Sequence, residues 1–122
     1  MRVVLASASP ARARLLSDAG VAHDVIVSNV DEDAVVVARG WTTAFDVAGG
    51  LATAKAQDVA ASIGTGHLVI GCDSVFDIDG EIHGKPATTA QARARWERMR
   101  GADGVLYTGH HIIDTTNGRE VA

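Results

Sequence analysis

Asp73 is the residue of this sequence that is hardest to explain by structure alone. It follows residues 67–72, a continuous apolar run that predicts a strand buried on both faces of an α/β sheet. Ligands of such sheets bind at the carboxyl ends of the strands. Asp73 is therefore a candidate general base or metal ligand, because apolar surroundings would raise its pKa and a nearby cation would lower it. The alternative is that Asp73 caps the turn after the strand.

A second group of polar residues follows the short apolar run at residues 3–6. Ser7 and Ser9 stand before Pro10, which opens a predicted helix, and Arg12 lies in the first turn of that helix. The free N–H groups of a helix N-terminus and a guanidinium both attract an anion such as phosphate. The alternative is that Ser9 only caps the helix and Arg12 points into water, although Ser7 comes too early to be the cap.

Three further charged residues could join such a site. Lys55 lies on the inward face of an Ala-rich predicted helix, where an ammonium needs a partner unless its stem reaches water. Glu32 lies between two aspartates, where it could hold a divalent cation or simply be solvated. Lys85 stands in a Gly-Lys-Pro loop and could meet a phosphate as a point charge, or be an ordinary surface lysine.

The segment Phe76-Asp77-Ile78-Asp79-Gly80 supports a competing hypothesis. It resembles the Asp-x-Asp-Gly signature of the haloacid dehalogenase superfamily, in which the first aspartate is a phosphoryl-accepting nucleophile. Glutamate follows the motif here, where that superfamily has threonine, and Asp79-Gly80 is typical of a tight hairpin turn. A nucleophilic Asp77 is therefore the minority alternative.

The elements that must position these residues alternate between strand and helix, which predicts a single α/β domain with a mixed, twisted sheet flanked by helices. Strands are expected at residues 3–6, 21–27, 67–72, 75–78, 81–82, 104–114 and 119–122. Helices are expected at residues 10–19, from Thr42 or Thr43 to 63, and from Thr88 or Thr89 to 100, with an acidic loop at 29–33. The first helix should bury Leu15, Leu16 and Ala19. Asp79-Gly80 and Asn117-Gly118 predict hairpin turns.

Composition and charge exclude several classes of protein. The 122 residues include 11 basic and 15 acidic side chains, a formal net charge of −4, and 47% of positions are apolar, which excludes a disordered tail and a polybasic nucleic-acid binder. Cys72 is the single cysteine, which fits a reducing compartment, and we expect it to be an inert core residue. No stretch approaches the roughly 18 apolar residues that span a bilayer. We expect a cytoplasmic protein whose partners include no nucleic-acid polymer and no membrane.

Six short motifs stand in this chain order: Leu5-Ala6-Ser7-Ala8-Ser9-Pro10, Asp31-Glu32, Leu51-Ala52-Thr53-Ala54-Lys55-Ala56, Gly71-Cys72-Asp73-Ser74-Val75, Gly84-Lys85-Pro86 and Tyr107-Thr108-Gly109. Together they resemble the Maf family of nucleoside triphosphate pyrophosphatases, which has an α/β fold similar to that of the inosine triphosphate pyrophosphatases. The motifs follow the family's order over nearly the whole chain, so the set is far more specific than any one of its members.

The resemblance implies hydrolysis between the α- and β-phosphates of a nucleoside triphosphate with a non-standard or pyrimidine base, which yields a monophosphate and pyrophosphate. It implies a divalent cation, Mg²⁺ or Mn²⁺, at Glu32 and Asp73, with Asp73 as the proton acceptor. The catalytic and substrate-binding residues that it implies are Asp73, Lys55, Lys85, Ser7, Ser9 and Arg12. Ala11 and Ser74 stand where many members have arginine and threonine, and both positions are associated with substrate choice.

The resemblance also implies a homodimer. Members of the family are substantially longer, so residues 1–122 are expected to form the N-terminal portion of a longer domain, without its later sheet and pocket residues. Two other functions stay open at this point. The chain could bind nucleotides without turnover, or it could be a haloacid dehalogenase-like phosphatase that uses Asp77.

Overall fold

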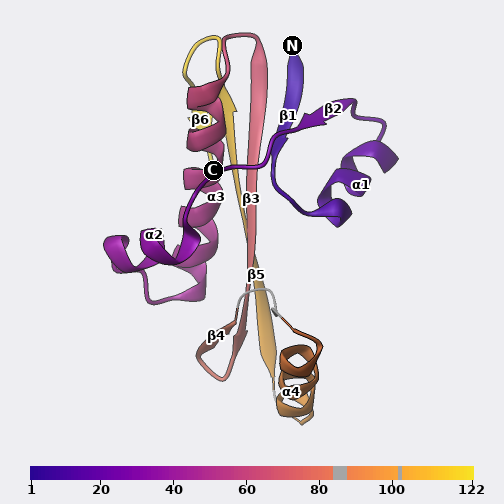
Figure 1. Ribbon diagram of the computed structural model, residues 1–122, viewed down its shortest axis with the longest axis vertical. Helices are drawn as coiled ribbons and strands as arrows, with labels where there is room; N and C mark the ends of the chain where they lie inside the picture. The colour runs from indigo at the N-terminus through magenta and orange to yellow at the C-terminus, as the bar shows by residue number, and fades with distance from the viewer. Residues whose placement is uncertain (84–87, 102) are drawn as a thin grey trace.

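Strands and helices alternate along the chain in the computed structural model, which describes residues 1–83, 88–101 and 103–122 (Figure 1). The strands are β1 (Arg2–Ala6), β2 (His23–Val25), β3 (His67–Ile78), β4 (Glu81–His83), β5 (Gly104–Asp114) and β6 (Glu120–Val121). The helices are α1 (Pro10–Asp18), α2 (Glu32–Arg39), α3 (Ala44–Ser62) and α4 (Thr89–Met99). The predicted α/β class with a mixed sheet is confirmed.

The sheet combines a parallel part with a long antiparallel ribbon. The strand order is β2-β1-β3-β5-β6, and β4 also pairs with β3. The pairs β1–β2 and β1–β3 are parallel, whereas β3 pairs with β4 and β5 in the antiparallel sense. Figure 1 shows the β3–β5 ribbon extending to α4 and β4 at its lower end, with α2 and α3 on one side of it and α1 on the other in this view.

One edge of β3 is left open between two of its partners. Because β5 pairs along almost the whole of β3, β1 and β4 must share the opposite edge. The pairing with β1 ends where Ala6 lies opposite Gly71, and the pairing with β4 begins where His83 lies opposite Phe76. Among the described residues, no strand lies beside residues 72–75 on that edge. We call this stretch the β3 gap.

Helix α3 packs directly on β3 and β5 at two glycines. A Cβ atom at Gly71 would lie 2.1 Å from the carbonyl oxygen of Ala52, and one at Gly109 would lie 2.4 Å from that of Ala48. Cβ atoms do not approach a carbonyl so closely, so only glycine lets the helix backbone reach the strands. The packing also fixes which face each strand residue takes.

The side chains of β3 divide between the two faces of the sheet. Directly paired residues of an antiparallel pair point to the same face, and neighbours along one strand point to opposite faces. Gly71 and Gly109 face α3, so Asp73, two residues after Gly71, faces α3 as well. Ser74 and its partner on β5, Thr108, face the other side.

Two buried clusters fill the space between α3 and the sheet. The first contains Val4, Ala6, Ala56, Val59, Val69 and Ile113. The second contains Ala44, Val47, Ala48, Leu51 and Val75. On α3, Lys55 lies between residues of the two clusters, and on β3, Asp73 does. The core is therefore interrupted at the place where the sequence predicts a site.

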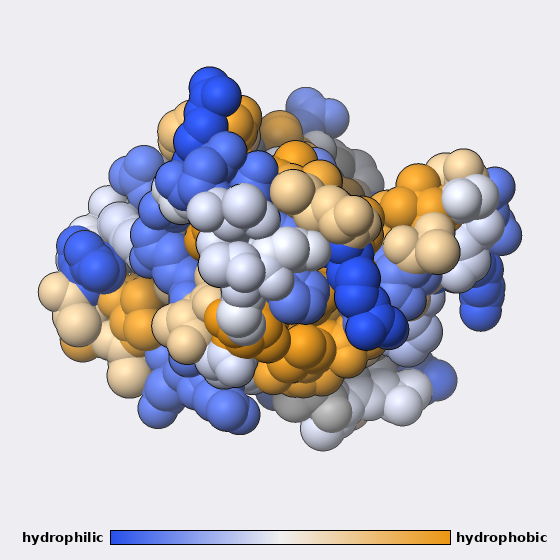
Figure 2. Space-filling model, turned by 90° about the horizontal axis from the view of Figure 1, so that it is seen from above, coloured by the Kyte–Doolittle hydropathy of each residue, from blue (hydrophilic) through white to orange (hydrophobic). Residues whose placement is uncertain are grey.

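The opposite face carries many exposed apolar side chains. Leu106 and Val121 are 61% and 63% exposed, and Leu15 of α1 is 69% exposed. Figure 2 shows hydrophobic (orange) atoms at the surface among hydrophilic side chains. The prediction that α1 buries Leu15, Leu16 and Ala19 is wrong, because α1 lies beside the short strand β2 and has no buried residue. No helix in the described part of the chain is long and apolar enough to cross a membrane.

The caps and turns that the sequence predicts are largely confirmed. Ser9, Thr43 and Thr88 are the N-caps of α1, α3 and α4. The Asp79-Gly80 turn has positive φ angles of 51° and 82°, as a two-residue hairpin turn of this type requires. The strand predicted at residues 104–114 has those bounds as β5. These signals are local, so the sequence carries them directly.

Three predictions of elements are wrong. The acidic loop at 29–33 instead begins α2, with Asp31 as its N-cap and Glu32 in its first turn, and the predicted strand at 21–27 is reduced to β2. The strand predicted to end at residue 72 continues to Ile78. Asp73 therefore lies within β3, just beyond the end of its parallel pairing with β1, and not at a strand end.

The close approach of α3 gives a first testable prediction. Gly71→Ala should lower the free energy of unfolding by about 1–3 kcal/mol, because the new methyl group overlaps the α3 backbone. Gly49→Ala is the matched control, since a Cβ at Gly49 meets nothing within 4 Å and alanine favours a helix by about 0.5–1 kcal/mol. Urea denaturation of both variants measures the difference. Equal stability of Gly71→Ala and Gly49→Ala would contradict the packing described here.

Candidate functional site

Lys55 joins three elements through two ion pairs. Its Nζ atom lies 2.9 Å from Oδ1 of Asp73 on β3 and 2.8 Å from Oε1 of Glu32 in the first turn of α2. The side chains of Lys55 and Asp73 are only 13% and 11% exposed, whereas that of Glu32 is 48% exposed. The Lys55 ammonium is thus held by two carboxylates and does not extend along the surface into water, which was the alternative.

Burial and charge shift the pKa values of this group. Burial raises the pKa of Asp73, and the negative charge of Glu32 adds to this, while the hydrogen bond and charge of Lys55 oppose it; the net pKa lies above its ordinary value. Burial lowers the pKa of Lys55, but the hydrogen bonds and charges of Glu32 and Asp73 outweigh it and raise the pKa. Asp73 is therefore a stronger proton acceptor than an ordinary aspartate, next to a permanent positive charge.

Arg12 forms a second cluster on the other face of β3. Its Nη1 atom donates to Oγ of Ser7 at 3.1 Å and to the carbonyl oxygen of Cys72 at 3.2 Å, and its Nη2 atom donates to Oγ of Ser74 at 2.9 Å. In the part of the chain that the structure describes, Arg12 Nε donates no hydrogen bond. One edge of the guanidinium thus stays available to an anion.

The two serines before α1 make different hydrogen bonds. The N-cap residue Ser9 accepts a hydrogen bond from the backbone N–H of Arg12 through its side chain. Ser7 is buried, and its Oγ accepts hydrogen bonds from the Ser9 backbone N–H and from the Arg12 guanidinium. The alternative for this segment was that Ser9 only caps the helix and that Arg12 points into water. It is correct for Ser9 and wrong for Arg12.

The two clusters meet at the β3 gap. Arg12 donates to the carbonyl of Cys72, which has no neighbouring strand on that edge, while Asp73 and Ser74 point to opposite faces. A ligand that touches both clusters must therefore lie across the open edge of β3. This place is beyond the carboxyl end of β1, where ligands of α/β sheets bind.

The remaining predicted residues are Ala11, Lys85, Cys72 and Asp77. Ala11 is exposed in the first turn of α1, and Lys85 lies outside the described residues. Cys72 is a free, buried thiol, and burial raises its pKa, which fits the expected inert core residue. Asp77 accepts a hydrogen bond from the backbone N–H of Gly80 at 2.8 Å, so its carboxylate serves the hairpin turn. The phosphatase alternative gains no support from this geometry.

Sequence reasoning assigned no role to Thr108. Its Oγ1 atom lies 3.1 Å from Oγ of Ser74, the serine that Arg12 contacts. The only signal in the sequence was its place in the Tyr107-Thr108-Gly109 motif. A contact between residues 74 and 108 depends on the pairing register of β3 and β5, which no local pattern reveals.

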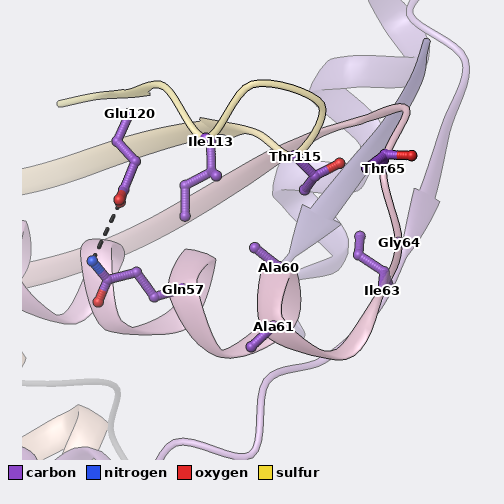
Figure 3. A pocket seen from close by; sticks show the side chains of 10 residues that line it. Gln57, Ala60, Ala61, Ile63, Gly64, Thr65, Ile113, Thr115 and Glu120 are labelled. Carbon is purple, nitrogen blue, oxygen red and sulfur yellow. Dashed lines mark hydrogen bonds between the residues drawn. The ribbon is translucent and has the colours of Figure 1, made fainter.

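A pocket in the described part of the chain lies away from the β3 gap. It has a volume of about 390 Å³ and lies at the C-terminal end of α3, where Ala60, Ile63 and Ile113 line it together with Gln57 and Glu120 (Figure 3). Gln57 donates a hydrogen bond to Glu120 across it, and it contains none of the predicted site residues. The chemistry-bearing groups point to the β3 gap as the candidate site.

The chain is similar to known proteins over nearly its whole length. The family described as "Maf-like protein" matches residues 2–122. A nucleoside triphosphate pyrophosphatase of Streptomyces coelicolor is 53% identical over 122 residues, covering 99% of this chain and 57% of that protein. One from Salinispora tropica is 50% identical and covers 98% of this chain and 53% of that protein. The chain thus spans little more than half the length of these relatives.

A solved structure agrees in fold. The crystal structure of a nucleoside-triphosphatase, a dITP/XTP pyrophosphatase from Mycobacterium abscessus, matches with a TM-score of 0.54 and 18% sequence identity. The match covers 99% of this chain and 69% of that one. At this identity the likeness concerns the fold alone.

The burial of Asp73 predicts a pH-dependent effect on stability. Because its folded pKa is raised above 3.8, the stability that Asp73 contributes is fully present below that value and is lost as the pH rises through the raised pKa. Asp73→Asn removes the charge, so its stability relative to the unmodified chain should increase between pH 4 and pH 8. Urea denaturation at both pH values measures this, with the exposed Asp103→Asn as the control. A constant difference between the two pH values would contradict the raised pKa.

Proposed function

The chain belongs to the Maf-like protein family, and we propose that it hydrolyses nucleoside triphosphates between the α- and β-phosphates to give a nucleoside monophosphate and pyrophosphate. The observation that carries the proposal is the meeting of the Lys55–Asp73–Glu32 group and the Arg12 cluster at the β3 gap. Two relatives that are 53% and 50% identical over the matched residues are named nucleoside triphosphate pyrophosphatase.

The charges at the β3 gap suit a polyphosphate. The whole chain has a formal net charge of −4, so a triphosphate needs a local positive field to bind. Arg12 supplies a guanidinium whose plane is already fixed by Ser7, Cys72 and Ser74, so its donors need little reorganisation when phosphate oxygens bind. Lys55 lies on the other side of β3, but it is already paired with two carboxylates, so the Lys55–Asp73–Glu32 group becomes positive only when it holds a divalent cation.

Asp73 is the proposed general base. Water attacks the α-phosphorus, its proton passes to the Asp73 carboxylate, a new O–P bond forms and the bond to the bridging oxygen breaks, so pyrophosphate leaves with the bonding electrons. The raised pKa of Asp73 makes it a better proton acceptor for this step than an ordinary aspartate. Ala11 and Ser74 leave the preferred base open, and we propose non-standard or pyrimidine nucleotides as the substrate class.

Glu32 and Asp73 are the residues that would hold a divalent cation, Mg²⁺ or Mn²⁺. No group of three or more His, Cys, Asp or Glu side chains in the described chain could hold a metal by itself. The two carboxylates nevertheless already converge on one positive charge, because both lie within hydrogen-bond distance of the same Lys55 nitrogen. Carboxylate oxygens suit these hard cations, and a bound cation would neutralise phosphate charge.

Three further properties of the chain are predictions: its oligomeric state, its location and whether it turns nucleotides over. The resemblance implies a homodimer, and the single buried thiol fits a cytoplasmic location. Binding of nucleotides without turnover is the second candidate function, because the chain spans little more than half the length of its relatives.

Product identification tests the proposed reaction. With Mg²⁺ or Mn²⁺ and a panel of triphosphates, the chain should release pyrophosphate, and Asp73→Asn should lower the rate by about 10²–10⁴-fold because the base is lost. Asp77→Asn is the matched control, since an asparagine oxygen can still accept the hydrogen bond of the turn, and its rate should be unchanged. Release of orthophosphate that Asp77→Asn abolishes would favour the phosphatase. Calorimetric binding without turnover would favour the second candidate function.

Metal binding in the absence of nucleotide tests the cation site. Lys55 occupies the place between the two carboxylates, so Lys55→Met should bind Mn²⁺ about tenfold more tightly, equivalent to about 1.4 kcal/mol of competing interaction. Glu32→Gln should bind it more weakly, because one ligand is lost, while Glu97→Gln on α4 should leave binding unchanged. Titration followed by electron paramagnetic resonance of free Mn²⁺ measures all three. Equal affinities of all variants would contradict the site.

A further inference from the structure

The orientation of the Arg12 guanidinium depends on three acceptors of unequal rigidity. The carbonyl of Cys72 belongs to the backbone of β3, and Ser7 is buried and also bonded to the Ser9 backbone N–H. Ser74 is different, because a serine hydroxyl rotates freely about χ1 unless something holds it. The Nη2 atom of Arg12 has Ser74 Oγ as its partner. A mobile Ser74 would leave that end of the guanidinium loosely held.

Thr108 is the residue that holds Ser74. The two hydroxyl oxygens lie 3.1 Å apart, and residues 74 and 108 are directly paired in the β3–β5 register. Thr108 is β-branched, so its own χ1 is restricted. The register is fixed next to it, because Gly109 faces α3 so closely that a Cβ there would lie 2.4 Å from the Ala48 carbonyl oxygen. Thr108 must then point to the Ser74 face.

We propose that Thr108 is a positioning residue of the substrate site, which acts through Ser74 to hold the Arg12 guanidinium for the phosphate oxygens of the triphosphate. The inference rests on the proposed function. With Ser74 fixed, the Nε edge of Arg12, which donates to no described residue, faces the substrate in one orientation. Thr108 has no charge, and among the described residues it is linked to Arg12 through the Ser74 hydroxyl.

Loss of the Thr108 hydroxyl should have a small effect that is confined to substrate binding. Thr108 is exposed, so its hydrogen bond is of the ordinary net strength, which corresponds to a change of about 3–10-fold in binding. Arg12 contacts phosphate in the ground state and in the transition state alike, so loss of the hydroxyl should raise KM and leave kcat nearly unchanged. A general loss of folding would instead lower the active fraction and thus the apparent kcat.

The experiment compares Thr108→Val, which keeps the shape and removes the hydroxyl, with Thr108→Ser, which keeps the hydroxyl. Thr108→Val should raise KM by about 3–10-fold and Thr108→Ser should restore it. Ser74→Ala and the double variant Ser74→Ala/Thr108→Val complete a cycle in which the double variant should be no worse than Ser74→Ala alone, because Thr108 acts only through Ser74. Thr42→Val, at an exposed threonine outside the site, is the matched control.

Additive effects in the cycle, or a Thr108→Val variant with unchanged KM, would overturn the proposal. If the chain binds triphosphates without turnover, the dissociation constant of a non-hydrolysable analogue replaces KM in the same comparison. A chain that neither hydrolyses nor binds triphosphates would contradict the proposed function instead. In that case ¹⁵N NMR of the Arg12 guanidinium tests its placement without nucleotide. Rotation of the guanidinium should be faster in Thr108→Val than in the unmodified chain. Unchanged rotation would overturn the positioning role.

Discussion

The backbone contact between α3 and the β3–β5 ribbon is the constraint on which the rest of the structure depends. It exists because two strand positions, Gly71 and Gly109, lack the Cβ atom that would push the helix away. The contact brings Lys55 of α3 within ion-pair distance of Asp73 on β3. It also sends the neighbouring strand residues to the opposite face, where Thr108 meets Ser74. One packing constraint thus sets both halves of the candidate site.

Burying the charged Lys55–Asp73 pair within the core costs folding free energy. The presence of this pair is therefore better explained by function than by a contribution to stability. Lys55 and Asp73 lie between two apolar clusters, and burying ions costs several kcal/mol each before their attraction is counted. Glu32 adds a second carboxylate and leaves the group one negative charge in excess. Such an arrangement is poorly suited to hold a fold together, but it suits a site that must accept a further cation and a proton.

The β3 gap explains why residues of opposite faces can serve one ligand. A continuous sheet would separate Asp73 from the Arg12 cluster, since adjacent side chains of a strand point to opposite sides. Because β1 ends at Ala6 and β4 pairs only from Phe76 onward, the edge between them is open and both groups reach it. The site therefore depends on where β1 ends as well as on the side chains that reach the open edge.

The sequence by itself determined the local features of this protein: the caps at Ser9, Thr43 and Thr88, the Asp79-Gly80 turn, the α/β class and the identity of the charged residues. Each of these depends on interactions within a few residues of the chain. It did not reveal α2, whose valine-rich sequence favours strand as much as helix, nor the exposure of Leu15. Only the tertiary structure decided that Lys55 bridges Glu32 and Asp73 and that Thr108 supports Ser74. Those contacts join residues between 18 and 34 positions apart along the chain. Strand register and helix packing, which are properties of the whole fold, bring them together.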